Sequence, residues 1–418
     1  MGRKKINFLM LILGGLGGVI GFFIGEFLLA RYIYTIPSVV LMGLYFGFIA
    51  LFVGMGCLIA EIMQTSINSN IWRTKYVGTS WRFLLPCTFG ILFVGGMFFQ
   101  LLYGLQYSGM KKIDDVVMLV DISGSMKKTD PKNKRFDAVY DLAGNMDQGK
   151  KASIIVFNDE IETALNMDYV SDSFRDELKQ KLEKYKEPDG GTNIEGALNE
   201  AANELNGSQG GAMVILLSDG GDTYNLKSNF NEVLLPFKKG KIPIYTVAMD
   251  GSDTKMLKSI SRKTKGDYVS IDNAENISYA FNKIYKNRDL RMLVTERGGY
   301  ASSSIFYSCL RELFIMAIGI LMGFGVGLVF DNRYIAKGLA IGGAISGIIA
   351  GFILEIGFLA FPWLDSLNRL VAVIALSTIF TLFTFIVPKD EAKTFYRGSM
   401  DNQIPLTKVG ARAHKSSF

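Results

Sequence analysis

The chain has 418 residues, enough for two or three domains, and its formal net charge is +6. Residues 111–298 hold 28 basic and 30 acidic side chains, whereas the other 230 residues hold only 17 basic and 9 acidic ones. The positive excess therefore lies in the apolar part of the chain, where no basic patch with interleaved aromatic residues occurs. This distribution excludes a nucleic-acid-binding protein as an interpretation.

Three long apolar stretches open the chain, near residues 6–30, 37–62 and 83–107. Each could cross a hydrocarbon core of about 30 Å, which takes about 20 helical residues. The first stretch is too long and too rich in glycine for a cleavable signal peptide, and further stretches follow it, so we expect it to stay in the protein. Residues 1–110 are therefore predicted to form a membrane domain of three helices within a lipid bilayer.

Residues 111–298 alternate between strand and helix patterns, which is typical of a doubly wound, mostly parallel α/β sheet. Apolar runs predict strands that end at Asp121 and Asp219, further strands at 151–157, 242–248 and 267–271, and a short antiparallel edge strand over 162–167. Helices are predicted near 134–147, 171–185, 194–206, 229–238, 253–264 and 274–288. Ser171 is expected to cap the second of them.

Three more apolar stretches, near 311–330, 337–361 and 368–387, predict a second membrane domain over 299–390, followed by a polar cytoplasmic tail over 391–418. Glycines recur between the two halves: those of the first and fourth stretches are Gly17, Gly21, Gly25 and Gly319, Gly323, Gly327, and those of the second and fifth are Gly43, Gly47 and Gly347, Gly351. This recurrence suggests an inverted repeat, as in many transporters. Small residues every four positions also simply let helices pack closely, and the third and sixth stretches do not match.

Two acids, Glu26 and Glu355, fall within the predicted spans. A carboxylate inside a bilayer is costly, so each is a candidate for transport, although a hydrogen bond or an interfacial position would also satisfy it. Cysteine adds no metal-binding pattern, and the single histidine, His414, lies in the polar tail.

The positive-inside rule predicts the orientation. If both termini are cytoplasmic, the inner loops and tail carry fourteen basic residues, among them Arg73, Lys75 and Arg82. The opposing outer loops carry Arg31 and Arg369, while Lys111, Lys112, Arg297 and Arg311 flank the soluble domain. This bias favours a multi-pass protein of the cell membrane with the soluble domain outside the cytoplasm.

Oxygen-bearing side chains follow the predicted strands of the soluble domain. The first strand ends in Asp121-x-Ser123-x-Ser125, Thr192 lies on a Gly-rich loop, and Asp219 ends another buried strand. Ligands of open α/β sheets sit at the carboxyl ends of the strands, so we expect these residues to meet there. Asp121 and Ser123 could instead only cap the following turn, but a cap does not need Thr192 and Asp219.

At these five positions the chain resembles the von Willebrand factor A family, whose metal-ion-dependent adhesion site is Asp-x-Ser-x-Ser, then a Thr, then an Asp. The resemblance covers about 180 residues. It implies Mg²⁺, with Mn²⁺ or Ca²⁺ as alternatives, and a hard cation of this kind prefers about six oxygen ligands. If the three hydroxyls bind directly and the two acids mainly through water, the metal stays electrophilic. The resemblance then implies that an acidic residue of a partner protein fills the open position.

Neighbouring polar residues are assigned smaller roles. Asp189 and Asp222 are expected to satisfy loop backbone groups, with a ligand role as the alternative, and Thr129 and Asp130 are expected on the surface. The domain contains no histidine, and the serines have no positioned base. We therefore expect a protein that is not an enzyme.

The leading interpretation is an integral membrane protein that presents a metal-dependent binding domain for adhesion or for assembly of an envelope complex. One alternative is a transporter or channel-like unit regulated by this domain. Another is a cytoplasmic partner of an AAA+ ATPase of the MoxR type, which would need the opposite orientation.

Overall fold

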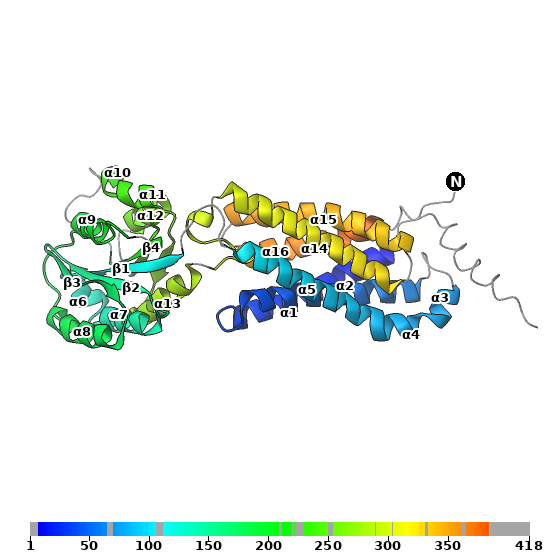
Figure 1. Ribbon diagram of the computed structural model, residues 1–418, viewed down its shortest axis with the longest axis horizontal. Coiled ribbons are helices and arrows are strands. Elements are labelled where there is room, and N and C mark those ends of the chain that lie inside the picture. Colours follow the sequence, from blue (N-terminus) through cyan, green and yellow to red (C-terminus); the bar gives the residue numbers. More distant parts are fainter. Residues whose placement is uncertain are drawn as a thin grey trace, which may run out of the picture. The chain divides into compact units, whose positions relative to one another are not determined.

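A computed structural model describes residues 7–64, 70–105, 112–208, 211–219, 221, 230–249, 254–288, 290–302, 304–330, 333–360 and 364–383. The chain divides into two compact units. A helical unit comprises Met1–Tyr103, Met292–Thr295 and Tyr307–Phe418, and an α/β unit comprises Gly104–Arg291 and Glu296–Phe306. Figure 1 shows the elements of each unit. The predicted tail over 391–418 lies outside the described residues, and the predicted domain limits stay predictions.

The α/β unit is built on a six-stranded sheet with the order β3-β2-β1-β4-β5-β6. Its strands are β1 (Ile113–Asp121), β2 (Lys151–Phe157), β3 (Ile161–Tyr169), β4 (Gly211–Ser218), β5 (Ile244–Met249) and β6 (Tyr268–Ile271). Only β3 is antiparallel to its neighbour, at the edge beside β2, as the sequence predicted. The predicted doubly wound, mostly parallel sheet is therefore confirmed.

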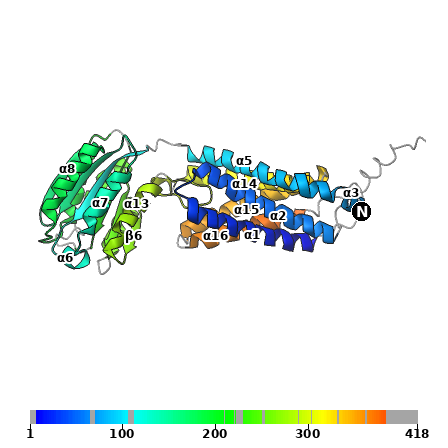
Figure 2. The same cartoon turned by 90° about the horizontal axis from the view of Figure 1, so that it is seen from below.

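Helices cover both faces of this sheet (Figure 1), and Figure 2 shows one of the two helical layers, so the central strands are buried on both sides. The helices are α6 (Met126–Thr129), α7 (Lys134–Asn145), α8 (Asp172–Leu182), α9 (Ile194–Glu204), α10 (Phe230–Val233), α11 (Leu235–Gly240), α12 (Thr254–Lys263) and α13 (Ile277–Asn287). Val116, Met118 and Val120 of β1 pack with α7, α8 and α13, whereas Val117 and Leu119 pack with α9, α11 and α12. This alternation explains the unbroken apolar run, because a strand buried on both faces has no solvent-facing positions.

Two local predictions for the α/β unit can be compared in detail. Ser171 caps α8, and its hydroxyl accepts the Phe174 N–H at 3.2 Å, as expected. The single helix predicted over 229–238 is wrong, since the chain forms α10 and α11 with a break at Leu234. Pro236 lies in the first turn of α11, where a backbone N–H has no partner within the helix, so its absence loses no hydrogen bond. In the middle of one continuous helix the same proline would remove a hydrogen bond and clash with the preceding turn.

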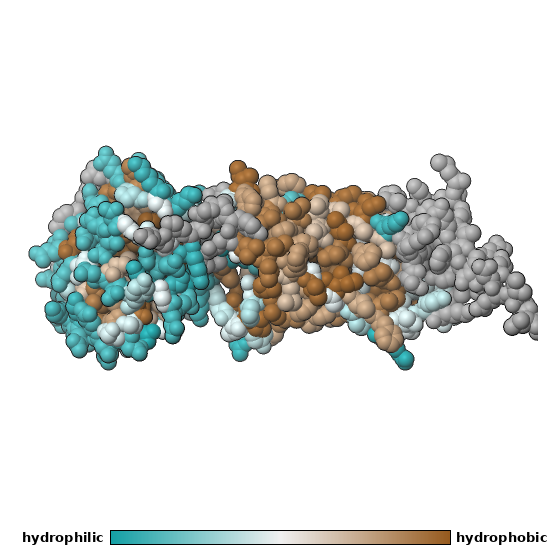
Figure 3. Space-filling view, viewed as in Figure 1, coloured by the Kyte–Doolittle hydropathy of each residue, from teal (hydrophilic) through white to brown (hydrophobic). Residues whose placement is uncertain are grey.

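The helical unit contains six helices long and apolar enough to cross a membrane, among the residues that the structure describes. They are α1 (Phe8–Tyr32), α2 (Ser38–Met63), the stretch Val77–Gly104 that ends in α5 (Leu85–Gly104), α14 (Ile305–Val329), α15 (Arg333–Ala360) and α16 (Asp365–Leu382). Short helices α3 (Asn70–Lys75) and α4 (Val77–Thr79) and a π-helical turn over Ser80–Leu84 precede α5. Apolar side chains dominate the visible surface of this unit in Figure 3.

Glycines let the first two helices of each half approach closely. A Cβ atom at Gly17 would fall against the Phe52 carbonyl of α2, and one at Gly323 would fall against the Leu339 carbonyl of α15, each closer than 3.0 Å. The glycine stripes predicted on α1 and α14 therefore share one role, which is to seat each helix on the next.

The second glycine pair does not share a role. Gly43 and Gly47 of α2 face α5 at Phe93 and Phe89, whereas Gly347 of α15 faces Met316 of α14. Across the halves, α1 packs against α16 and α5 against α14. Thus α1 contacts α2 of its own half and α16 of the other, and α14 contacts α15 of its own half and α5 of the other. This contact pattern suits an inverted repeat, which stays a hypothesis.

Two largely buried ion pairs lie near one end of the helical unit. Arg369 holds Glu26 through two bonds of 2.6 and 2.9 Å, and Arg311 holds Glu355 at 3.1 Å. Both acids that the sequence marked as transport candidates are thus paired with arginines. These contacts favour a structural role for both glutamates, because the paired arginine stabilises the charged carboxylate in its apolar surrounding.

The same arginines hold the non-helical segment Met292–Thr295, whose first three residues are almost fully buried. Arg369 donates to the Val294 carbonyl at 3.4 Å and Arg311 to the Thr295 carbonyl at 2.5 Å. The Leu293 N–H donates to the buried Gln100 side chain at 3.0 Å. Backbone groups outside a helix need such partners when water is excluded. This segment is therefore part of the helical unit.

We expect Gly323→Leu to destabilise the helical unit by about 1–3 kcal/mol, because the larger side chain must push α14 away from α15. The measurement is the thermal midpoint of the full-length protein in detergent. Phe324→Leu is the matched control, since Phe324 is 44% exposed on the same helix. If Gly323→Leu and wild type melt together, the two helices do not depend on this close contact.

Candidate metal site

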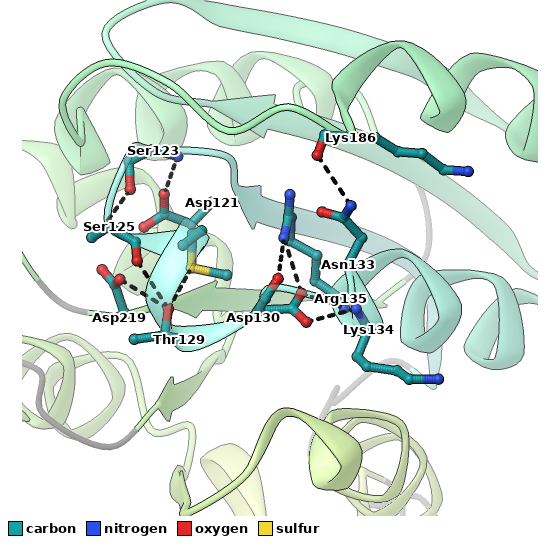
Figure 4. A network of polar contacts seen from close by, with 11 residues as sticks. Asp121, Ser123, Ser125, Thr129, Asp130, Asn133, Lys134, Arg135, Lys186 and Asp219 are labelled. Atoms are coloured by element: carbon teal, nitrogen blue, oxygen red, sulfur yellow. Dashed lines mark hydrogen bonds and ion pairs between the residues drawn. The ribbon is translucent and has the colours of Figure 1, made fainter.

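The site begins with the parallel pairing of β1 and β4. Val120 lies opposite Leu217, so both strands end at the same edge of the sheet and carry Asp121 and Asp219 there. The Ser218 hydroxyl donates to Asp121 Oδ2 at 2.6 Å and ties the two strand ends together. Figure 4 shows the two acids and the serines of the first loop facing a common space.

The first loop turns sharply around Asp121. Its Oδ1 accepts the Ser123 N–H at 2.8 Å. This bond forms an Asx turn, in which an aspartate side chain accepts from the backbone two residues later. The hydroxyls of Ser123 and Ser125 lie 3.0 Å apart. Ser123 is buried, whereas Ser125 is exposed, so the loop runs from the interior to the surface within three residues.

The Gly-rich loop lies against this first loop through backbone hydrogen bonds. The Gly124 N–H donates to the Gly190 carbonyl, and the Asp189 N–H donates to the Ile122 carbonyl, both at 3.0 Å. Thr192, only 4% exposed, follows directly and precedes α9. The structure therefore brings together the loops that carry all five predicted residues.

Two residues after β2 position the Gly-rich loop, and the sequence reasoning missed both. Asp159 accepts the Gly191 N–H at 2.7 Å, and Asn158 donates its amide to the Asp189 carbonyl at 3.0 Å. A side chain at Gly190 would meet the Asp159 carboxylate, and Gly190 also has a φ of +78°, which favours glycine. The available signal was the pair Asn158-Asp159 directly after a buried strand that neighbours β1.

The expectation that Asp130 is a surface residue is wrong, whereas Thr129 is partly exposed. Asp130 is fully buried and pairs with the equally buried Arg135 at 3.0 Å. The Thr129 hydroxyl donates to Asp219 Oδ2 at 3.2 Å (Figure 4). Polar residues after a loop usually face solvent, but here α6 is only one turn long, and the chain folds back beneath the site to begin α7.

Negative charge accumulates at the site among the residues that the structure describes. Burial raises the pKa of Asp121 to about 6 despite the opposing hydrogen bonds from Ser123 and Ser218, and the nearby Asp219 carboxylate contributes to this rise. The nearest buried cation, Arg135, is held by Asp130, and burial lowers the pKa of its guanidinium. An added divalent cation would offset this charge.

The side chains present fit a hard cation. Two carboxylates and three hydroxyls form an all-oxygen donor set, which Mg²⁺, Mn²⁺ and Ca²⁺ prefer. Within the described part of the chain, no group of three or more His, Cys, Asp or Glu side chains is placed to hold a metal, so any site here depends on the hydroxyls as well. Asp189 is exposed and contributes backbone bonds, and Asp222 lies outside the described residues. The ligand roles of Asp121, Ser123, Ser125, Thr192 and Asp219 stay predictions.

We expect the metal-free protein to become more stable as the pH falls from 7 to 5. The folded pKa of Asp121 lies above its unfolded value, so the folded state takes up a proton in this window that the unfolded state does not. The gain is on the order of 1 kcal/mol. Amide exchange in β1 and β4, measured in EDTA, should slow accordingly. In Asp121→Asn this pH dependence should disappear, and its persistence would assign it to another group.

Comparison with known proteins places the α/β unit in a family. The model of the von Willebrand factor type A domain matches residues 115–284. No curated protein matches the sequence.

Among solved structures, the chain is similar to a von Willebrand factor type A protein from Catenulispora acidiphila at 14% identity and a TM-score of 0.38, covering 44% of this chain and 47% of that one. An aerotolerance-related membrane protein from Bacteroides fragilis is 20% identical, with 42% of this chain and 100% of that chain covered and a TM-score of 0.34. Proximal thread matrix protein 1 from the mussel byssus, with a zinc-occupied MIDAS motif, is 19% identical, with 43% and 46% covered and a TM-score of 0.37. The chain spans about half the length of the first and third of these.

Residues 115–284 form a von Willebrand factor type A (VWA) domain, and three long apolar helices lie on each side of it in the sequence.

Proposed function

We propose that this chain is an integral membrane protein whose VWA domain binds an acidic side chain of a partner protein through a divalent metal, foremost Mg²⁺. One observation carries this proposal. Asp121, Ser123 and Ser125 turn toward Asp219 at the carboxyl edge of the sheet, and Ser125 is exposed there. A site whose acids are buried and whose Ser125 is exposed can accept a ligand from outside.

The residue types explain why a partner would be needed. Ser123, Ser125 and Thr192 would hold the metal through neutral oxygens, and Asp121 and Asp219 would act mainly through water. A metal held in this way keeps much of its charge and attracts an outside carboxylate. Mg²⁺ would supply this electrophilic contact, while the chain fixes the hydroxyls and excludes other donors. The soluble domain has no histidine in its sequence to act as a base for the serines, which supports a binding role over an enzymatic one.

We propose further that the VWA domain lies outside the cytoplasm, in adhesion or in an envelope complex. The support is the excess of basic residues in the segments assigned to the inside. Arg311 and Arg369, two of the outer cations, are each paired with a carboxylate, which weakens them as topological signals. A cytoplasmic partner of a MoxR-type ATPase would need the reverse orientation. A transporter is less well supported, since Glu26 and Glu355 are held in ion pairs.

Labelling with an impermeant thiol reagent tests the orientation. Cysteines at the exposed positions Lys179 and Lys239 of the VWA domain should react in intact spheroplasts, whereas a cysteine at Arg73 should react only after lysis. The background carries serine at Cys87 and Cys309, which are exposed on their helices. The reverse pattern would place the domain in the cytoplasm and restore the ATPase-partner interpretation.

Cross-linking in native membranes tests whether a metal mediates binding. A partner captured with wild type should be released by EDTA and by Thr192→Ala, with a loss of affinity of about a hundredfold. Thr192 is informative because its hydroxyl is uncharged and its removal leaves the net charge of the site unchanged. Ser173→Ala is the control, since that hydroxyl is exposed on α8 and away from the site. A partner retained under both treatments would bind elsewhere on the protein.

A further inference from the structure

We infer that Thr129 is a positioning residue of the metal site, a sixth member that holds Asp219 in place. This inference rests on the proposed metal-binding function and names a residue outside the five-residue pattern. It starts from a contact across 90 residues of sequence, in which Thr129 Oγ1 lies 3.2 Å from Asp219 Oδ2.

The Thr129 hydroxyl has a single proton and three acceptors in reach. Besides Asp219, these are the Ser125 carbonyl at 3.4 Å and the Met126 sulfur at 3.5 Å. The carboxylate is the closest and the only charged acceptor, and hydrogen bonds to charged acceptors are the stronger ones. The proton of Thr129 is therefore directed to Asp219 rather than to its own helix.

Thr129 is held firmly enough to act in this way. Helix α6 is one turn long, with Met126 fully buried at its start and Asp130 fully buried directly after it. The Asp130 carboxylate accepts the Lys134 N–H at 2.7 Å, the Arg135 N–H at 3.0 Å and the Arg135 guanidinium at 3.0 Å. A buried ion pair with these bonds resists displacement, because moving either member would leave a charge unpaired. The anchor lies one residue from Thr129.

The contact gives Asp219 a defined orientation. With Oδ2 bound to Thr129, the carboxylate cannot rotate freely about its side chain, and Oδ1 is left for the metal or for a water bound to it. The hydroxyl adds no charge, so it orients the acid without reducing the attraction of the site for a cation. Without Thr129 the acid would have to lose this rotational freedom on each binding event.

Manganese binding by the full-length protein in detergent tests this inference, with free Mn²⁺ followed by electron paramagnetic resonance. Thr129→Val keeps the shape and removes the hydroxyl, and we expect Kd to rise on the order of tenfold. Thr129→Ser keeps the hydroxyl and should stay within about twofold of wild type. Thr163→Val is the matched control, because the Thr163 hydroxyl also contacts a carboxylate, that of Glu200, on β3 away from the site. It should bind as wild type does.

The outcomes separate the inference from the proposed function. If wild type binds no Mn²⁺, or binds it as Asp121→Ala does, the metal site itself is refuted and the inference falls with it. If Asp121→Ala loses binding but Thr129→Val does not, only the role of Thr129 is refuted. If Thr129→Ser is as weak as Thr129→Val, the effect comes from packing and the positioning role is likewise refuted. Amide exchange in β1 and β4 shows whether each variant keeps its fold.

Discussion

The candidate site depends on the parallel pairing of β1 with β4. This pairing places two strand ends at one edge, and the Ser218 hydroxyl bond to Asp121 fixes how far each strand extends. A shift of one residue would turn Asp121 into one of the helix layers, because successive side chains of a strand point to opposite faces. Both faces of β1 are filled by apolar side chains from helices, so such a shift would also bury polar groups without partners. The packing of the sheet thereby protects the geometry of the site.

Loops complete the site, and these loops are tied together by backbone groups rather than by the proposed ligands. Residues 122–124 bond to residues 189–190, and Asn158 and Asp159 hold the same loop from the side of β2. Beneath them, the pair of Asp130 and Arg135 fixes the turn that carries Thr129. Residues outside the five-residue pattern therefore supply many of the bonds that hold these loops together.

The helical unit is held by a different set of forces. Glycines bring α1 onto α2 and α14 onto α15, where van der Waals contact replaces the hydrophobic effect that lipid does not supply. At one end, Arg369 and Arg311, each paired with a glutamate, donate to the carbonyls of Val294 and Thr295. The charges that appeared to mark a transport path thus serve the packing of an irregular segment. Their cost in an apolar surrounding is offset by mutual pairing and by these carbonyl contacts.

Local pattern in the sequence determined much of this protein. Apolar periodicity predicted the sheet, its antiparallel edge and the six long helices. Residue type at the strand ends also indicated which loops would meet at the carboxyl edge of the sheet. Contacts between distant segments could not be predicted in this way. Thr129 and Asp219 are adjacent only because α6 folds back under the loop, Asp130 is buried only because Arg135 reaches it, and Glu26 meets Arg369 only after α16 packs on α1. Such pairings depend on how whole elements pack, and no single stretch of sequence encodes them.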